Sequence, residues 1–421
     1  MSYASGQPQD LFQLAAVTPA ELAAIAAAAA GSPVARPVAH PAPIAYDWGS
    51  PATAGLWQVE VTSDGEPACA LFVKLVRHTR LWPVLSHLPD EASRAEFVSY
   101  YPWHYELDIH QAGIESVLPD GMRTPVLHHV TRPNDDHMGL WWEFIRERPG
   151  SWDLADYRLA ARLLGQLAAR RRAGAEVNKA LPEIARNRAS ALRFYTTRRV
   201  ISGVLPALRA GEIWHHPVLQ AALRQAAEPA LPADMLALGE RLPQLLDMLD
   251  ELPQTHAHGD ASPQNLLLPE DEPGTIAIID WGFGTLLPVG FDLGQLLVGL
   301  AHARDTDLSQ LPAIDAEIFP AYLDGLASED YKVDPAHVRT GYIGSLAARS
   351  ALCAIPAEQL SSAEPTDDTV ALFARRIQLT RLMLDMAREV WPLRSRARAL
   401  VTTDGARAST TGNYAPSHAL T

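Results

Sequence analysis

The stretch "HAHGDASPQNLLLPEDEPGTIAIIDWGFG", residues 256–284, decides how the rest of the chain is interpreted. Two apolar runs, "NLLL" and "TIAIID", flank "PEDEPG", whose composition is typical of a turn, so the pattern predicts a β-hairpin. Opposed residue numbers in an antiparallel pair add to a constant. With the turn centred close to residue 272, Asn265 lies opposite Asp280 at the open end of the hairpin. Asp260 precedes Asn265 at the same end, so three oxygen-bearing side chains are expected to meet there.

These side chains suit phosphoryl-transfer chemistry. Carboxylate and amide oxygens are ligands for Mg²⁺, which proteins often hold through one or two groups together with substrate phosphates. A carboxylate that does not bind the metal can orient or deprotonate a hydroxyl group. Protein kinases divide the roles in this way, with a catalytic-loop Asp, an Asn five residues later and a following Asp-Phe-Gly. Asp260 and Asn265 have this five-residue spacing, and Asp280 is followed by Trp-Gly.

Length, charge and cysteine content limit the possible classes of protein. A chain of 421 residues suggests two lobes or domains. Its net charge of -14 disfavours sequence-independent binding to nucleic acid, which requires Lys and Arg to neutralise phosphates. Two cysteines provide no disulfide framework, and a cytoplasmic location is expected. The most membrane-like segment, "AELAAIAAAAAG", is short and has the caps of an ordinary helix, so no membrane partner is predicted.

The N-terminal part of the chain has the alternation of a mainly antiparallel sheet. "LWQVEV" (56–61) and "ACALFVKLV" (68–76) flank an Asp-Gly turn and predict a hairpin that carries Lys74. Two further strands are predicted in "TPVLHHV" and "GLWWEFI", and helices in "EASRAEFVSYY" and "WHYELDIHQAG". The Pro-rich residues 32–46 are interpreted as an extended linker.

After Pro149-Gly150 the spacing of apolar residues becomes helical. The predicted fold class is therefore α+β, with a small β-rich lobe and a larger, mostly helical lobe. The expected division is an N-terminal helix and linker (1–40), a nucleotide-binding lobe (41–146), a helical lobe (147–395) containing the catalytic segment 256–294, and a disordered tail (396–421).

"HGDASPQN" followed by "IIDWG" resembles the aminoglycoside phosphotransferase and choline kinase family, small-molecule kinases with a protein-kinase-like bilobal fold. Gly259 stands where protein kinases have Arg, as is typical of this family. Only twelve residues separate Asp280 from Asp292, which leaves no room for the long activation segment of a regulated protein kinase. "GFDL" resembles the family's Gly-x-Asp-Leu segment, which implies that Asp292 supports the catalytic loop and caps a helix.

The resemblance implies ATP and Mg²⁺ as cofactors and assigns roles to individual residues. Asp260 would be catalytic, and Asn265 and Asp280 would bind the metal. Lys74 would contact the ATP phosphates, with Glu106 as its partner and Glu96 as the alternative. The residues implied in nucleotide binding are Lys74, Glu106, Gly49, Gly55 and the hinge residues Glu143, Phe144 and Ile145. The glycine loop departs from the family pattern, because "YDWGSPATAGLW" has no dense Gly-x-Gly-x-x-Gly.

Several of these residues also have purely structural interpretations. Lys74 alone would be a strand lysine with a buried stem, and His258 is expected to be a hydrogen-bonded support rather than an acid or base. The acidic stretches "AIDAEIF" (313–319) and "LASEDYKVD" (326–334) could attract a cationic acceptor, although a solvated face is the simpler interpretation.

The sequence predicts an ATP- and Mg²⁺-dependent phosphotransferase that acts on a hydroxyl group of a small molecule. An aminoglycoside-like or other hydroxylated antibiotic and a metabolite such as a sugar or an amino-alcohol all remain open as acceptors. One alternative is a catalytically silent nucleotide-binding protein with a regulatory role. Another is a protein kinase, which Gly259 and the short segment after Asp280 disfavour.

Overall fold

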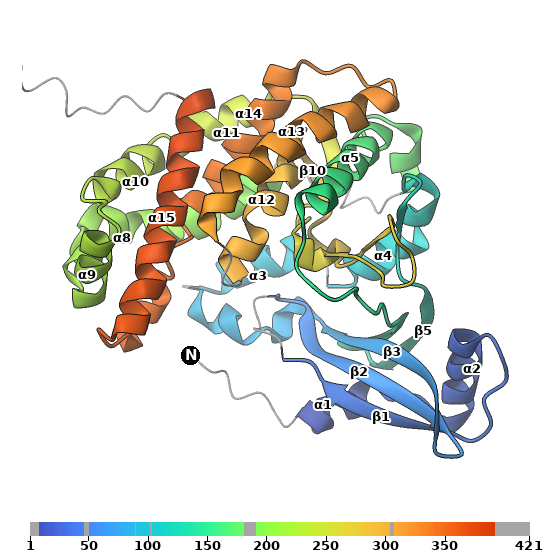
Figure 1. Cartoon of the computed structure of the whole chain (residues 1–421). Helices are drawn as coiled ribbons and strands as arrows, with labels where there is room; N and C mark the ends of the chain where they lie inside the picture. The colour runs from blue at the N-terminus through green and yellow to red at the C-terminus, as the bar shows by residue number, and fades with distance from the viewer. Residues whose placement is uncertain are drawn as a thin grey trace, which may run out of the picture.

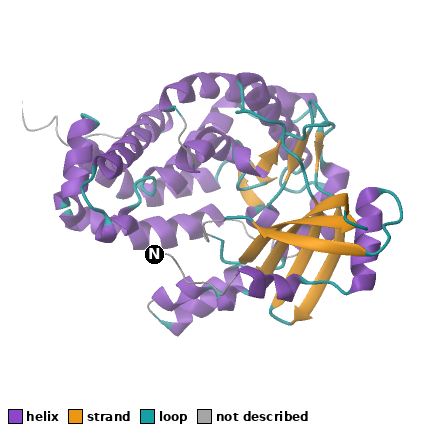
Figure 2. Ribbon diagram, turned by 60° about the horizontal axis from the view of Figure 1, so that its bottom comes forward, coloured by secondary structure: helices purple, strands orange, loops and turns teal. Residues whose placement is uncertain are grey.

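The computed structural model describes residues 8–45, 50–88, 90–101, 103–180, 191–303 and 307–391. A lobe with a five-stranded antiparallel sheet lies against a larger helical lobe (Figure 1). Seen from another direction, the sheet occupies one side of the molecule and helices make up most of the rest (Figure 2). The fold class is α+β, with a small β-rich lobe and a larger, mostly helical lobe, as the sequence predicts.

The large sheet has the strand order β1-β2-β3-β6-β5. Its strands are β1 (Pro37–Pro43), β2 (Thr53–Ser63), β3 (Glu66–Arg77), β5 (Leu127–Asn134) and β6 (His137–Glu143). The predicted hairpin is confirmed: β2 and β3 meet at Asp64 and Gly65, whose positive φ angles of 52° and 89° are those of a type I′ turn. Lys74 lies in the central strand β3, opposite Leu56 on one side and Leu140 on the other.

The prediction of a linker at residues 32–46 is wrong for its central part. Residues 37–43 form the edge strand β1, paired with β2 from Pro37 opposite Ser63 to Pro43 opposite Trp57. Ile44, at an even position, donates its backbone N–H to the Leu56 carbonyl (2.9 Å). Alternate residues of a strand face the same side, so a backbone N–H at an odd position of β1 would point away from β2. The prolines of β1 stand at odd positions and therefore cost the strand no hydrogen bond to β2. An edge strand tolerates proline in this arrangement.

Two N-terminal helices cover one face of this sheet, α1 (Pro8–Ala15) and α2 (Pro19–Ala30) (Figure 1). The predicted caps of α2 are present: Thr18 and Glu21 form a capping box, and Gly31 ends the helix in the left-handed conformation. Helix α1 was not predicted from the sequence. Its end is fixed to the sheet by the Trp141 indole N–H, which donates to the Ala15 carbonyl (3.0 Å).

Short strands and helices connect the sheet with the helical lobe. The helices are α3 (Glu91–Tyr100) and α4 (Tyr105–Gln111). One small sheet joins β4 (Met122–Arg123), β9 (Ile276–Ile278) and β8 (Leu266–Leu267), and another pairs β7 (Gln254–Ala257) with β10 (Thr285–Pro288). The pairing of β4 with β9 brings a segment next to the large sheet into contact with the predicted catalytic hairpin.

The helical lobe surrounds a continuous apolar core. Its helices are α5 (Leu154–Arg170), α7 (Ala191–Tyr195), α8 (Leu205–Ala210), α9 (Pro217–Gln225), α10 (Leu231–Gly239), α11 (Leu242–Asp250), α12 (Phe291–Ala303), α13 (Leu311–Ser328), α14 (Pro335–Leu346) and α15 (Asp367–Val390). None of the helices in the described ranges combines the length and hydropathy needed to cross a bilayer.

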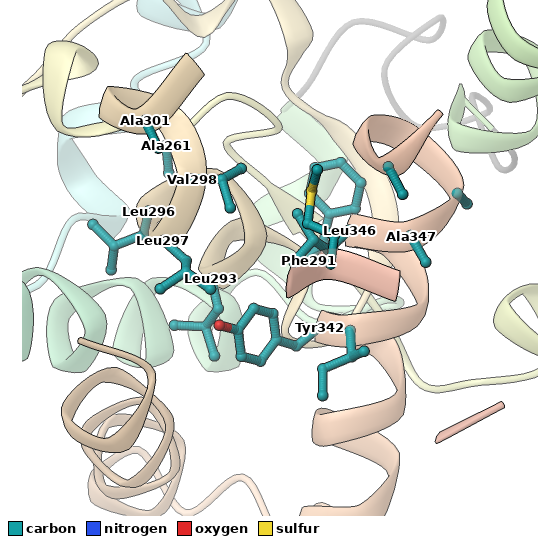
Figure 3. Close-up of a cluster of buried hydrophobic side chains, with 14 of the residues drawn as sticks. Ala261, Phe291, Leu293, Leu296, Leu297, Val298, Ala301, Tyr342, Leu346 and Ala347 are labelled. Atoms are coloured by element: carbon teal, nitrogen blue, oxygen red, sulfur yellow. The ribbon is translucent and has the colours of Figure 1, made fainter. Parts of the chain in front are cut away.

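Helix α12 forms the floor beneath the loop that precedes the catalytic hairpin. Leu293, Leu296, Leu297 and Val298 are buried in the core with Ala261 of that loop, and Phe291 lies beside Leu346 of α14 (Figure 3). A Cβ atom on Gly299 would collide with the side chain of Ser262, so only glycine permits the loop to lie this close to α12. The loop at residues 258–262 therefore rests on a rigid, well-packed element.

Candidate active site

The predicted hairpin is present, with a register shifted by one residue. Leu266 pairs with Ile278, and the Ile279 N–H donates to the Asn265 carbonyl (3.0 Å). Asn265 therefore lies opposite Ile279, and the prediction that it lies opposite Asp280 is wrong by one position. Asp280 follows β9 by two residues and adopts a left-handed conformation (φ 59°, ψ 64°). A non-glycine residue in this region is uncommon and is often found at functional sites.

Lys74, Glu106 and Asp280 form an ion cluster that joins three distant segments of the chain. The Lys74 ammonium lies 2.6 Å from Glu106 Oε2 and 3.2 Å from Asp280 Oδ1. These residues come from β3, from α4 and from the end of β9. The alternative partner, Glu96, instead forms an ion pair with Arg198. Of the two glutamates considered from the sequence, the structure brings Glu106 to Lys74.

The charge states of this cluster follow from burial and mutual attraction. Burial is the largest influence on the pKa of Asp280 and would raise it, but the Lys74 cation outweighs burial and the pKa is lowered. For Glu106 burial prevails over Lys74, and the pKa is raised. Burial would lower the pKa of Lys74, yet its two carboxylate neighbours raise it. Lys74 is thus a cation and Asp280 an anion at neutral pH.

Asp260 is held by hydrogen bonds on both carboxylate oxygens. The Asn265 amide nitrogen donates to Asp260 Oδ2 (3.1 Å) and to the Asp260 backbone carbonyl (2.8 Å). Arg349 donates from Nη2 to Asp260 Oδ1 (2.9 Å) and from Nη1 to the carbonyl of Gly259. The structure brings Asp260 and Asn265 together as predicted. Arg349 was not foreseen, because it lies far from every motif in the sequence.

Buried residues behind the loop fix its backbone. Asp292 accepts N–H bonds from His258 (3.0 Å) and Gly259 (2.9 Å). His258 bonds the Ile279 carbonyl through Nε2 (2.9 Å) and accepts from the Asp260 N–H through Nδ1 (3.3 Å). His258 is a buried support, as predicted. Asp292 supports the loop, but it lies inside the first turn of α12, and the prediction that it caps a helix is wrong.

Gly259 is required by both its conformation and its surroundings. Its φ of +84° lies in the left-handed region that glycine favours. A Cβ atom at this position would also collide with the backbone carbonyl of Phe283, in the segment that follows Asp280. The glycine therefore allows the catalytic loop and the Asp280 segment to touch through their backbones.

Gly259→Ala is expected to destabilise the protein by about 2–4 kcal/mol, because backbone strain and a steric clash add together. Gly274→Ala provides a matched control. Its φ is +82° and a Cβ there meets nothing within 4 Å, so the control measures strain alone. Chemical denaturation of both variants gives the two free energies of unfolding. Equal losses of stability would show that the contact with Phe283 costs nothing.

A cavity of about 240 Å³ opens between the sheet and the hairpin, beside the ion cluster. The predicted hinge residues Glu143, Phe144 and Ile145 line it, together with Glu106 and Asp280. The Glu143 side chain is held by Arg123, which donates to both of its oxygens (2.8 and 2.9 Å) and also binds Glu272 in the hairpin turn. Five predicted site residues thus converge on a single cavity.

Of the two predicted loop glycines, the structure describes only Gly55, which is not among the described residues that line this cavity. Gly49 lies outside the described residues. Gly55 lies inside strand β2 rather than in a loop, and a Cβ atom there would collide with the ring of Trp57. The prediction that Gly55 belongs to a nucleotide loop is therefore corrected: its lack of a side chain makes room for a buried tryptophan.

The donor set fits a magnesium ion. Asp280 supplies an anionic carboxylate, and Asn265 keeps its amide oxygen available because its nitrogen is committed to Asp260. No group of three or more His, Cys, Asp or Glu residues suited to a metal ion occurs in the described parts of the chain. Mg²⁺ needs no such cage when substrate phosphates and water complete its coordination.

The sequence and the structure were compared with known proteins. A profile of the phosphotransferase enzyme family matches residues 110–331, more than half of the chain. No curated protein sequence gives a significant match. Similar solved structures include an aminoglycoside phosphotransferase from Alicyclobacillus acidocaldarius, with a TM-score of 0.47 and 14% identity over 92% of this chain and 98% of the other.

Two further structures are similar at comparable levels. The choline kinase of Cryptosporidium parvum has a TM-score of 0.43 and 12% identity, covering 84% of this chain and 92% of its own. The ethanolamine kinase of Plasmodium vivax has a TM-score of 0.43 and 12% identity, covering 81% and 82%. The family profile itself includes Asp260, Asn265 and Asp280 and spans over half of the sequence, so the chain belongs to the phosphotransferase enzyme family.

Proposed function

We propose that this protein transfers the terminal phosphoryl group of ATP to a hydroxyl group of a small molecule, with Mg²⁺ as the metal. The main support is the Lys74–Glu106–Asp280 ion cluster, two members of which, Glu106 and Asp280, line the same cavity as the hinge. The Asp260–Asn265 pair belongs to the loop that leads into the hairpin carrying Asp280. An inert scaffold would have no need for this combination of a buried lysine, two carboxylates and a carboxamide.

In this mechanism Asp260 acts on the acceptor. Its carboxylate is held by Asn265 and Arg349 and can accept a further hydrogen bond from the acceptor hydroxyl. The hydroxyl oxygen forms a bond to the terminal phosphorus of ATP, the bond from phosphorus to the oxygen of ADP breaks, and the hydroxyl proton passes to Asp260 or to water. Because phosphoryl transfer depends mainly on positioning and charge, orientation of the hydroxyl is the main task of this residue.

Lys74 and the metal ligands act on the nucleotide. Glu106 and Asp280 keep the Lys74 ammonium charged and fixed at the cavity, where it can donate to phosphate oxygens. Asn265 and Asp280 would hold Mg²⁺, which when bound neutralises charge on the phosphates. Fixed hydrogen-bond donors stabilise the remaining negative charge of the transferring phosphoryl group, and they need not reorganise during the reaction.

The hinge would bind the adenine ring through its backbone. The Glu143 N–H already donates to the Val126 carbonyl (2.8 Å), and the Glu143 side chain is occupied by Arg123. Phe144 and Ile145 therefore offer the hinge N–H groups that remain for a nucleotide. This assignment makes residues 41–146 the nucleotide-binding lobe and residues 147–395 the lobe that supplies Asp260 and the acceptor site.

The test is a phosphate-transfer screen over hydroxylated antibiotics and metabolites, with detection of the product by mass spectrometry. We expect one acceptor class to gain the mass of a phosphoryl group, with stoichiometric ADP, and the transfer to stop when EDTA removes the metal. ATP binding without transfer to any compound would instead favour a silent nucleotide-binding module. Label on protein rather than on small molecules would indicate a protein kinase.

A further inference from the structure

The acceptor side of Asp260 is occupied by an arginine. Arg349 comes from the π-helical turn Ala347–Ala351 that continues α14, and its side chain is only 16% exposed. It donates to Asp260 Oδ1 and to the carbonyl of Gly259. Because a guanidinium stays protonated throughout the physiological range, a permanent positive charge lies against the carboxylate that would receive the acceptor.

Aromatic rings hold this guanidinium in place. Its central carbon lies 5.8 Å from the ring centroids of Tyr195 and Phe283 and 5.7 Å from that of Phe291. Such cation–π contacts favour a fixed orientation. The two bonds to the catalytic loop use two of its five N–H groups. The side chain is partly exposed, so its uncommitted N–H groups can pair with a ligand beside Asp260.

A row of half-buried rings continues from Phe283 toward α3. Tyr101 packs edge-on against Phe283 with 5.8 Å between centroids. Phe97 stacks on Tyr101 (5.9 Å) and on Trp82 (5.4 Å). Helix α3, which carries Phe97, has no fully buried residue and lies between the sheet and the helical lobe (Figure 1). A row of aromatic side chains therefore extends from the Arg349 guanidinium toward α3.

The acidic stretches that could have attracted a cationic acceptor are engaged elsewhere. Asp315 and Glu317 of the first stretch pair with Arg339 and Arg158. In the second stretch, Glu329 pairs with Arg170 (2.8 Å). These carboxylates are matched by arginines of the same lobe, in agreement with the structural interpretation of the sequence.

We propose that Arg349 determines the acceptor class. The acceptor is a compound that has an aromatic ring and, next to the reacting hydroxyl, a carboxylate, as in an aromatic 2-hydroxy acid. Arg349 Nη2 and Asp260 Oδ1 are 2.9 Å apart, so a group held by the arginine and a hydroxyl held by the aspartate lie close enough to be carried on neighbouring carbons. The carboxylate pairs with the free N–H groups of Arg349, and the ring lies on the aromatic row. A polyamine is disfavoured, because its charges meet the guanidinium. This inference rests on the proposed function and narrows it.

The test compares aromatic 2-hydroxy acids, mandelate and phenyllactate, with their uncharged amides as acceptors for the wild-type enzyme. We expect kcat/KM to be about 10- to 100-fold higher for each acid than for its amide, the range of a charge-assisted hydrogen-bonded pair. In Arg349→Gln this ratio should fall toward one. A purely structural role would lower both kcat/KM values together and leave their ratio unchanged. Arg349→Lys, which keeps the charge and loses the fork, should show an intermediate ratio.

Arg339→Gln is the matched control, because Arg339 also lies over aromatic rings and pairs with a carboxylate but is not bonded to the catalytic loop. The acid-to-amide ratio of kcat/KM for Arg339→Gln should equal that of the wild type. Equal wild-type activity on acids and amides, or a ratio that Arg349→Gln does not change, would overturn the inference. Transfer to the polyamine kanamycin and to neither acid would also overturn it, while supporting the proposed function. Absence of transfer to every compound in the wider screen would count against both.

Discussion

Asp260→Asn will lower kcat by about 10²- to 10⁴-fold, the range that a positioned acid–base group contributes. The substitution removes the negative charge that attracts and orients the acceptor hydroxyl while keeping nearly the same shape. Asp260 is not among the residues that line the cavity at the hinge. The affinity for ATP should therefore change by less than about threefold. The corresponding change in binding free energy is smaller than the contribution of one hydrogen bond to a charged group.

The hydrogen bonds of Asp260 make this substitution more severe than a simple loss of charge. Asn265 donates to one carboxylate oxygen and Arg349 donates to the other. An asparagine has a single acceptor oxygen, so its NH₂ group must face one of these two donors. The side chain will turn or the loop will shift, and either change misplaces the acceptor. Misplacement by about an ångström can by itself cost about 100-fold in rate.

Steady-state kinetics with a saturating acceptor will give kcat, and calorimetric titration will give the affinity for ATP. Asp247→Asn is a matched control, because Asp247 is exposed on α11 and pairs only with Arg193 among the described residues. It should leave both quantities unchanged. Turnover of Asp260→Asn close to that of the wild type would remove Asp260 from the mechanism.

The parts of the site that sequence reasoning could predict are those encoded by local pattern. The alternation around Asp64-Gly65 specifies a two-residue turn, which in turn fixes Lys74 in a central strand. The spacing within residues 256–284 likewise brings Asp260 next to Asn265. In these cases the interactions that shape the backbone lie within a few residues of one another.

The features that could not be predicted depend on contacts that no local pattern records. The hairpin register differs by one residue because a turn of this length can close in more than one way, and the sequence pattern does not select between these closures. Proline composition suggested a linker over residues 32–46, whereas pairing with β2 makes residues 37–43 a strand. Arg349 reaches Asp260 from a helix 89 residues later, through a packing arrangement that spacing alone does not specify.

Lys74→Met is expected to lower both the stability of the protein and its use of ATP. Without the ammonium, Glu106 and Asp280 remain at the cavity with no counter-charge, and breaking such a buried pair costs about 3–5 kcal/mol. Loss of a fixed donor to the phosphates should reduce kcat/KM for ATP by about 10²- to 10³-fold. Denaturation and steady-state kinetics measure the two effects separately.

The loss of stability should depend on pH in a direction that identifies its cause. In the wild type, Lys74 lowers the pKa of Asp280, so this carboxylate stabilises the fold at neutral pH and the contribution is lost as the pH falls through its lowered pKa. In the variant, burial acts without the cation and raises the pKa of both carboxyl groups above their unfolded values. The folded variant then binds more protons than the unfolded chain, and its stability decreases as the pH rises. The deficit relative to the wild type should be larger at about pH 8 than at about pH 5.

A second substitution tests whether repulsion between uncompensated carboxylates is the origin of this deficit. Adding Glu106→Gln to Lys74→Met removes one buried charge, so the double variant should recover part of the lost stability and show a weaker pH dependence. Kinetic activity should not recover, since the donor to the phosphates is still missing. Lys332→Met, at an exposed lysine, is the control and should have little effect at either pH. A deficit that is the same at both pH values would mean that Lys74 contributes through packing of its stem, and the cluster would then have no electrostatic role in preparing the site for a nucleotide.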